Sequence, residues 1–121
     1  MQTIPVYYIN LASRPDRRAF MERQFGRLGI AAERIEAVRM DEVPRELLDW
    51  HGTTHSLWRL AAGDLACGLS HQRSWSRLLD SGAPAALVLE DDVQIATPVL
   101  DFLDPGVPAQ LGADLLKLET F

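Results

Sequence analysis

Cysteine and lysine are nearly absent from this chain of 121 residues. Its single cysteine, Cys67, excludes an internal disulfide framework and any zinc site built from several cysteines. All basic residues except Lys117 are arginine, the side chain best suited to bidentate contacts with phosphate. The formal net charge of -5 lacks the positive surplus of a general nucleic-acid binder, so we expect no nucleic-acid partner.

Long apolar runs and targeting signals are also missing. No stretch approaches the about 18 consecutive apolar residues of a membrane-spanning helix. Residues 1–3 lead into an apolar segment without the basic region or the small-residue cleavage site of a signal peptide. We therefore expect no transmembrane segment and a cytoplasmic location, with any contact to the inner membrane being peripheral.

The common nucleotide-binding loops are absent as well. The sequence has no Gly-rich Walker loop with its lysine, and no Gly-x-Gly-x-x-Gly follows the first apolar segment. ATPase and dinucleotide-dependent reductase functions therefore lose support. What is present is an ordinary globular composition, 47% hydrophobic and 24% charged, in a length that fits a single domain over residues 1–121.

Apolar segments and helical patterns alternate along the chain. Short apolar runs bounded by turn residues predict strands, and amphipathic spacing predicts helices. The predicted strands cover residues 6–11, 30–38, 85–89 and 114–119, the helices cover 14–28, 64–80 and 98–103, and 39–63 form a loop with one or two helical turns. Strand, helix and strand in this order predict an α/β fold with a mostly parallel, doubly wound sheet flanked by helices.

Two of the predicted helices have recognisable ends. The first begins with Ser13 as N-cap and Asp16 as the acidic half of a capping box, and Gly29 ends it. The helix of residues 64–80 stops at Gly82. We expect its core-facing side to carry Cys67, His71, Trp75, Leu78 and Leu79. Cys67 would then be a small buried apolar residue.

Three consecutive carboxylates, Glu90, Asp91 and Asp92, follow the third predicted strand. Neighbouring anions repel one another, by about 1 kcal/mol per pair in water and more near a protein surface. Strand alternation places Glu90 and Asp92 on one side and Asp91 opposite. The first and third carboxylates could therefore share a hard ion such as Mg²⁺ or Mn²⁺. The alternative is a solvated acidic turn.

Three arginines, Arg14, Arg17 and Arg18, surround the start of the first predicted helix. Cations are unfavourable there, by a few tenths to about 1 kcal/mol each against the helix dipole. Free backbone N–H groups and guanidinium groups would together favour a bound phosphate. In the alternative interpretation the arginines point into solvent or pair with Asp16 and Glu22.

Both polar segments follow strands, and ligands of open α/β sheets bind beyond the carboxyl ends of the strands. Asn10, at the end of the first strand, and the acidic triplet should therefore lie at the same edge. A helix start that binds anions beside a carboxylate triplet suits a diphosphate bridged to the protein by a divalent ion. Such an ion would neutralise charge on a departing diphosphate.

Four motifs in this order resemble glycosyltransferase family 25, which includes lipooligosaccharide galactosyltransferases of bacterial surface-glycan synthesis. The motifs are Val6–Leu11 with the following Arg14, Asp16, Arg17 and Arg18; Arg34–Val38; Gly63–His71; and Leu87–Val93. The resemblance implies a GT-A-like fold and a metal-dependent enzyme. It would move a sugar, galactose being the expected one, from a UDP-sugar to a glycan acceptor such as lipooligosaccharide.

The resemblance also implies roles for individual residues. Asp92 is the expected ligand of Mn²⁺ or Mg²⁺, and Glu90 assists it or contacts the ribose. The donor-binding set comprises Asn10, Arg14, Arg18, Ser70, His71 and Asp91. Ser70 and His71 match family positions, but chemistry alone leaves His71 open between a substrate contact and a hydrogen-bonded core histidine.

The chain departs from the family in its length. It stops at Phe121, whereas family members continue for roughly as long again, through the half that should hold the acceptor and the general base. We therefore expect the donor-binding half of a truncated fold, with no general base to nominate. If residues 114–119 form a strand, an exposed edge there would favour homo-oligomers.

Two other functions remain as alternatives. A truncated or vestigial module could hold a nucleotide-sugar without turnover. A phosphoacceptor receiver domain fits the length and the α/β class, but it needs an acidic pair after the first strand and a lysine at a later strand end. Here Asn10 and Leu11 follow the first strand, and Lys117 lies inside a predicted strand.

Overall fold

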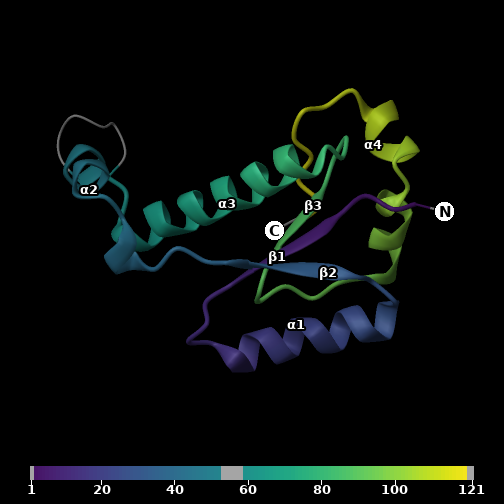
Figure 1. Cartoon of the computed structure of the whole chain (residues 1–121), viewed down its shortest axis with the longest axis horizontal. Helices are drawn as coiled ribbons and strands as arrows, with labels where there is room; N and C mark the ends of the chain where they lie inside the picture. Colours follow the sequence, from purple (N-terminus) through teal and green to yellow (C-terminus); the bar gives the residue numbers. More distant parts are fainter. Residues whose placement is uncertain (1, 53–58, 120–121) are drawn as a thin grey trace.

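A computed structural model describes residues 2–52 and 59–119 of the chain. Among these residues, β1 (Val6–Asn10), β2 (Ala32–Glu36) and β3 (Leu87–Glu90) form one parallel sheet in the order β2-β1-β3. Helix α1 (Pro15–Leu28) packs on one face of the sheet and α3 (Ala62–Ser81) on the other (Figure 1). The predicted α/β class, with a parallel sheet flanked by helices, is confirmed, and the sheet agrees with part of a GT-A-like domain.

Shorter helices complete the described chain. A 3-10 helix, η1 (Met40–Glu42), and α2 (Arg45–Gly52) occupy the segment that we expected to be mostly loop. After β3 come the 3-10 helix η2 (Thr97–Leu103) and α4 (Gly106–Leu111), which lie together at the far end of the sheet from α2 (Figure 1). None of the helices in the described ranges combines the length and the hydropathy needed to span a membrane.

The central strand β1 is buried over its whole length and divides the core into two layers. Val6 and Tyr8 face α1, where they join a cluster with Met21 and Phe25. The alternate side chains, among them Tyr7, belong to a second cluster with Leu78 of α3 packed against it. The alternation of a strand therefore holds both helical layers on one sheet.

The C-terminal ends of α1 and α3 lie where their glycines predict them, whereas the predicted N-cap of α1 is wrong. Gly29 and Gly82 adopt φ of 70° and 71° and end α1 and α3, as predicted. The prediction of Ser13 as N-cap is wrong, because Arg14 occupies that position and makes no side-chain cap. Pro15 sets φ at the first helical position, so the helix starts there without a capping hydroxyl.

The predicted core-facing side of α3 is wrong for most of its members. Trp75 and Leu79 are 48% and 82% exposed, and Cys67 is exposed as well. Its buried residues are instead Leu65, Ala66, Ser70 and Ser74. Small and hydroxyl side chains let the helix approach the chain around residue 38, where the Ser70 hydroxyl accepts from the Val38 amide.

The predicted strand at residues 114–119 is also wrong, because that segment carries no regular structure. Leu115 is 81% exposed, and Leu116 and Leu118 are 48% and 43% exposed. Alternating apolar residues form a strand only where their backbone N–H and C=O groups can hydrogen-bond to a neighbouring strand. Because no strand forms there, the segment offers no edge through which homo-oligomers could assemble. Self-association itself stays a prediction.

Candidate functional site

The site lies where the connections of the sheet reverse direction. The chain leaves β1 for β2 on one side and then crosses over to β3 on the other, so the reversal falls between β1 and β3. Ile9 of β1 pairs with Glu90 of β3, which sets Asn10 beside the acidic triplet. The predicted convergence of the two segments at one sheet edge is confirmed, at the position where open α/β sheets bind ligands.

Asn10 is the centre of this edge and is 1% exposed. Its side-chain amide donates to Asp91 Oδ2 at 2.9 Å and to the carbonyl of Arg14 at 3.1 Å. Its Oδ1 accepts from Nε of Arg34 at 2.9 Å, and Arg34 also donates to the Asn10 carbonyl at 2.8 Å. One buried amide therefore connects three segments, β1, β2 and the end of β3.

The middle carboxylate of the triplet is turned inward. Asp91 is buried and, besides its bond from Asn10, lies 3.4 Å from Nη1 of Arg17 in α1. On the other flank, Arg34 forms an ion pair of 2.7 Å with Glu36, whose pKa this guanidinium lowers. Asp91 is thus fixed by the protein itself and has little capacity left for a ligand.

The arginines at the start of α1 are paired within the protein. Arg14 makes two contacts to Asp16, at 2.9 and 3.0 Å, and Arg18 lies 2.8 Å from Glu22. This pairing is the alternative that the sequence left open, and it accounts for the cations at this helix start. Both arginines remain about half exposed, at 42% and 51%, so anion binding by them stays a prediction.

Glu90 faces the opposite way from Asp91, toward α3. Its Oε1 accepts from the Cys67 thiol at 3.2 Å and lies 3.2 Å from Nε2 of His71. The bond from Cys67 and then that from His71 lower the pKa of Glu90, whereas burial and the same carboxylate raise the pKa of the Cys67 thiol to about 11. We call this group the Cys67 cluster (Cys67, His71 and Glu90).

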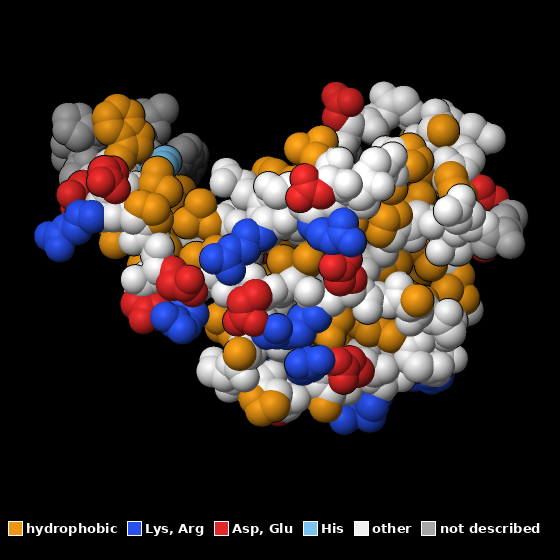
Figure 2. Space-filling model, in the orientation of Figure 1, with side chains coloured by type: hydrophobic (Ala, Val, Ile, Leu, Met, Phe, Trp, Pro, Cys, Tyr) orange, Lys and Arg blue, Asp and Glu red, His pale blue; other side chains and the backbone are white. Residues whose placement is uncertain are grey.

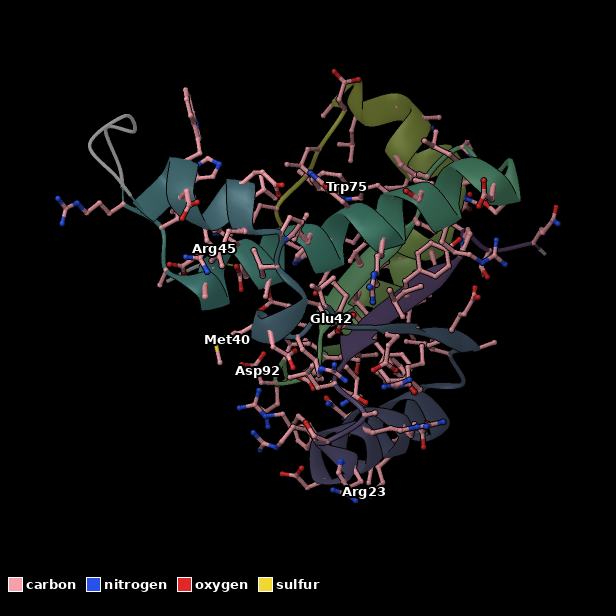
Figure 3. The ribbon with its side chains drawn as sticks, turned by 60° about the vertical axis from the view of Figure 1, so that its left-hand side comes forward. Arg23, Met40, Glu42, Arg45, Trp75 and Asp92 are labelled. Carbon is pink, nitrogen blue, oxygen red and sulfur yellow. The ribbon has the colours of Figure 1, made fainter. Side chains whose placement is uncertain are left out.

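The remaining predicted residues differ sharply in exposure. Ser70 is 2% exposed, and its hydroxyl donates to the Ala66 carbonyl while accepting from the Val38 amide. Asp92 is exposed, and within the described ranges it has no hydrogen bond or ion pair. Figure 3 shows Asp92 at the end of the sheet. Among the triplet, Asp92 is therefore the carboxylate most open to a ligand.

Sequence reasoning missed two participants. Arg34, which holds Asn10 from the neighbouring strand, was only part of a motif, although an arginine inside a strand next to a polar strand end is a usable signal. Cys67 was assigned to the core, yet it shares a helix face with His71 four residues later. A cysteine and a histidine four residues apart on a helix predict that both side chains contact the same neighbour.

A hollow of about 620 Å³ lies outside this edge, along β2 and α3. Figure 2 shows blue and red side chains alternating over that face. Ion pairs join α3 to the neighbouring elements: Arg77 pairs with Glu33 of β2 at 2.9 Å, and Arg73 pairs with Glu42 of η1 at 3.6 Å. Because these charges neutralise each other, we place the candidate site at the carboxyl edge and not in this hollow.

An open parallel sheet with buried amide, arginine and carboxylate groups at its switch point has the architecture of α/β domains that bind ligands at this edge. A comparison with known families refines this class. The family "Glycosyltransferase family 25 (LPS biosynthesis protein)" matches residues 3–117. The chain belongs to glycosyltransferase family 25.

Individual relatives agree. Lacto-N-neotetraose biosynthesis glycosyltransferase LgtB of Neisseria meningitidis serogroup B is 34% identical over 94% of this chain and 44% of its own length. Procollagen galactosyltransferase 1 of Danio rerio is 32% identical, and Inactive glycosyltransferase 25 family member 3 of Mus musculus is 31% identical, each over 74% of this chain and 16% of the relative. The chain thus spans less than half the length of these curated relatives.

Proposed function

We propose that this chain is the donor-binding part of a glycosyltransferase that moves a sugar, galactose, from a UDP-sugar to a cell-surface glycan such as lipooligosaccharide. Membership of family 25 supports the transfer reaction. The names of relatives that are galactosyltransferases or act in lacto-N-neotetraose biosynthesis support the sugar and the acceptor. The observation that carries the proposal is the exposed Asp92 beside the anchored Asp91 at the switch point of the sheet.

The residues present fit a hard divalent ion, Mn²⁺ or Mg²⁺. Asp92 offers an exposed carboxylate. Glu90 contacts Cys67 and His71 through Oε1, so its second oxygen is left for an ion. Carboxylate oxygens are the ligands that such ions prefer. When bound, the ion supplies charge neutralisation for a departing diphosphate. Asp91, held by Asn10 and Arg17, would fix the position of the backbone between these two carboxylates.

The arginines of α1 would meet the phosphates of the donor. Arg14 and Arg18 now hold exposed carboxylates, and each such pair adds little to stability because solvent screens it. Exchanging Asp16 or Glu22 for a doubly charged diphosphate therefore costs little and gains bidentate contacts. Asn10 is fully used inside the protein, so its role would be to position this edge.

Calorimetry of UDP binding with and without Mn²⁺ tests the proposal. We expect binding that depends on Mn²⁺ and that Asp92→Asn weakens by at least about tenfold, because one ionic ligand is lost. Asp114→Asn, an exposed change outside the triplet, is the matched control and should bind as the parent does. Binding that is indifferent to Mn²⁺, or equal in the Asp92 variant, would contradict the metal assignment.

A module that binds nucleotide-sugar without turnover is the second candidate. One relative is named as inactive, and the described chain offers no general base at the donor edge that we can assign. Incubation with UDP-galactose and a lacto-series acceptor separates the two functions. Transfer of labelled galactose by this chain would refute the binding module, whereas Mn²⁺-dependent UDP binding without transfer would support it. We also propose a cytoplasmic location, peripheral to the inner membrane.

A further inference from the structure

The ligand atoms of the Cys67 cluster converge on one point. The Cys67 Sγ, the His71 Nε2 and a Glu90 carboxylate oxygen all lie within 4.8 Å of one another. Two of these separations, from Glu90 Oε1 to the sulfur and to the nitrogen, are 3.2 Å. We propose that these three residues bind a zinc-type transition-metal ion, through the Glu90 oxygen that faces Cys67 and His71 and without Asp92.

Two of the three separations are close to those of ligands around tetrahedral zinc. Zinc binds cysteine sulfur at about 2.3 Å and histidine nitrogen or carboxylate oxygen at about 2.0–2.1 Å, so tetrahedral ligands lie about 3.3–3.6 Å apart. The two measured separations of 3.2 Å are close to this range. The sulfur and the nitrogen lie within 4.8 Å of each other, so a shared ion would have to draw them to a similar separation.

The scaffold presents the ligands from two regular elements. Cys67 and His71 lie one helical turn apart on α3, and Glu90 is the last residue of β3. The thiol is exposed, and the side chains of His71 and Glu90 are 30% and 48% exposed. An ion and a water as fourth ligand can therefore enter, as in the open zinc sites that keep one position for an exchangeable ligand.

The surrounding charge also favours a cation. Besides Glu90, which contacts the thiol, Asp64 lies three residues before Cys67 on α3 and Asp92 lies two residues after Glu90. A divalent ion would offset these anions, and the proton of the coordinating thiol would be released to solvent. Because the thiolate is a soft ligand and imidazole suits zinc, this set selects zinc-type ions over Mn²⁺ and Mg²⁺. The zinc site is argued from these side chains alone, and it does not depend on the proposed sugar transfer.

Cobalt and zinc titrations of the full chain, in a phosphine reductant that leaves metals free, provide the test. We expect one equivalent of Co²⁺ to give a thiolate charge-transfer band in the near ultraviolet, which Zn²⁺ abolishes by displacement. X-ray absorption of the zinc form of the unaltered chain should show one sulfur at about 2.3 Å. A zinc spectrum without sulfur scattering would overturn the site, whatever any variant does.

Variants separate the two metal sites. Cys67→Ser should lose the charge-transfer band and weaken zinc binding beyond the about 10–100-fold typical of an outer-shell partner. Asp92→Asn should keep the band, and the control Asp114→Asn, an exposed change outside both groups, should keep both the band and the zinc affinity. Equal zinc binding by the Cys67 variant, or loss confined to the Asp92 variant, would refute the proposal. Mn²⁺-dependent UDP binding is read separately by calorimetry, so either site can fail alone.

Discussion

Asn10→Ala should be among the most destabilising changes at this edge, although the residue is neutral and small. The substitution removes three side-chain hydrogen bonds, to Arg14, Asp91 and Arg34, at 2.9–3.1 Å. Bonds to a charged group are worth about 1.5–3 kcal/mol and neutral ones about 0.5–1.5 kcal/mol. Because Arg34 keeps its contacts with Glu36 and with the backbone, we take the low end, about 3–4 kcal/mol.

That loss is large for a chain of this size. At about 0.05–0.15 kcal/mol per residue, 121 residues have a free energy of unfolding of about 6–18 kcal/mol. Urea unfolding followed by circular dichroism should therefore show a midpoint lower by about 1–3 M with an unchanged slope. Gln72→Ala, an exposed change on α3, is the control and should stay within about 0.5 kcal/mol of the parent.

A second variant separates hydrogen bonding from packing. Asn10→Asp keeps the shape and the acceptor for Arg34 but sets a carboxylate against Asp91, so one of the pair should have a raised pKa in the folded state. The folded state then binds the proton more readily than the unfolded state, and the lost stability should return as pH falls through that pKa. An alanine variant within about 1 kcal/mol of the parent, or an Asp variant indifferent to pH, would refute the reasoning.

Two further predictions concern α3. Cys67 should react with iodoacetamide at pH 8 about tenfold more slowly than an ordinary thiol, because its pKa of about 11 leaves less thiolate, partly offset by greater nucleophilicity. Glu90→Gln should speed the reaction by removing the anion, and an unchanged rate would contradict this account. Gly82→Ala should cost about 1 kcal/mol in urea unfolding because φ is 71° there. Gly68→Ala is the control inside the same helix, where the added Cβ would meet nothing within 4 Å. It should stabilise the chain by about 0.5–1 kcal/mol. Equal effects at both glycines would refute the backbone argument.

Local signals were sufficient for the main elements of the fold. The apolar run of β1, the glycine after α1 and the order of strands and helices determine the parallel sheet, and each depends on neighbouring residues only. The convergence of Asn10 with the acidic triplet also followed, because parallel strands end at one edge. The expected division of the triplet agrees in part, since Glu90 faces α3 and Asp91 faces Asn10 and Arg17.

The failures involve contacts between distant segments. The buried side of α3 depends on the hydrogen bond between the Val38 amide and the Ser70 hydroxyl. A prediction from amphipathic spacing instead buries the more hydrophobic tryptophan and exposes the serine. Trp75 lies on the outer side of α3 in Figure 3 for this reason. The pairing of Arg14 with Asp16 depends on side-chain geometry that charge counting cannot resolve. The metal ligands and donor contacts stay predictions, which the experiments above address.

The bond between Asn10 and Asp91 joins residues 81 positions apart in the chain. Such a contact carries the loop-closure cost of about two-thirds of the sequence, so it should form late in folding and break early in any partial unfolding of β3. The edge that would receive the donor therefore exists only in fully folded molecules. A ligand bound there would stabilise the folded chain by mass action. Saturation of this edge would then report the folded fraction of a preparation as well as its affinity.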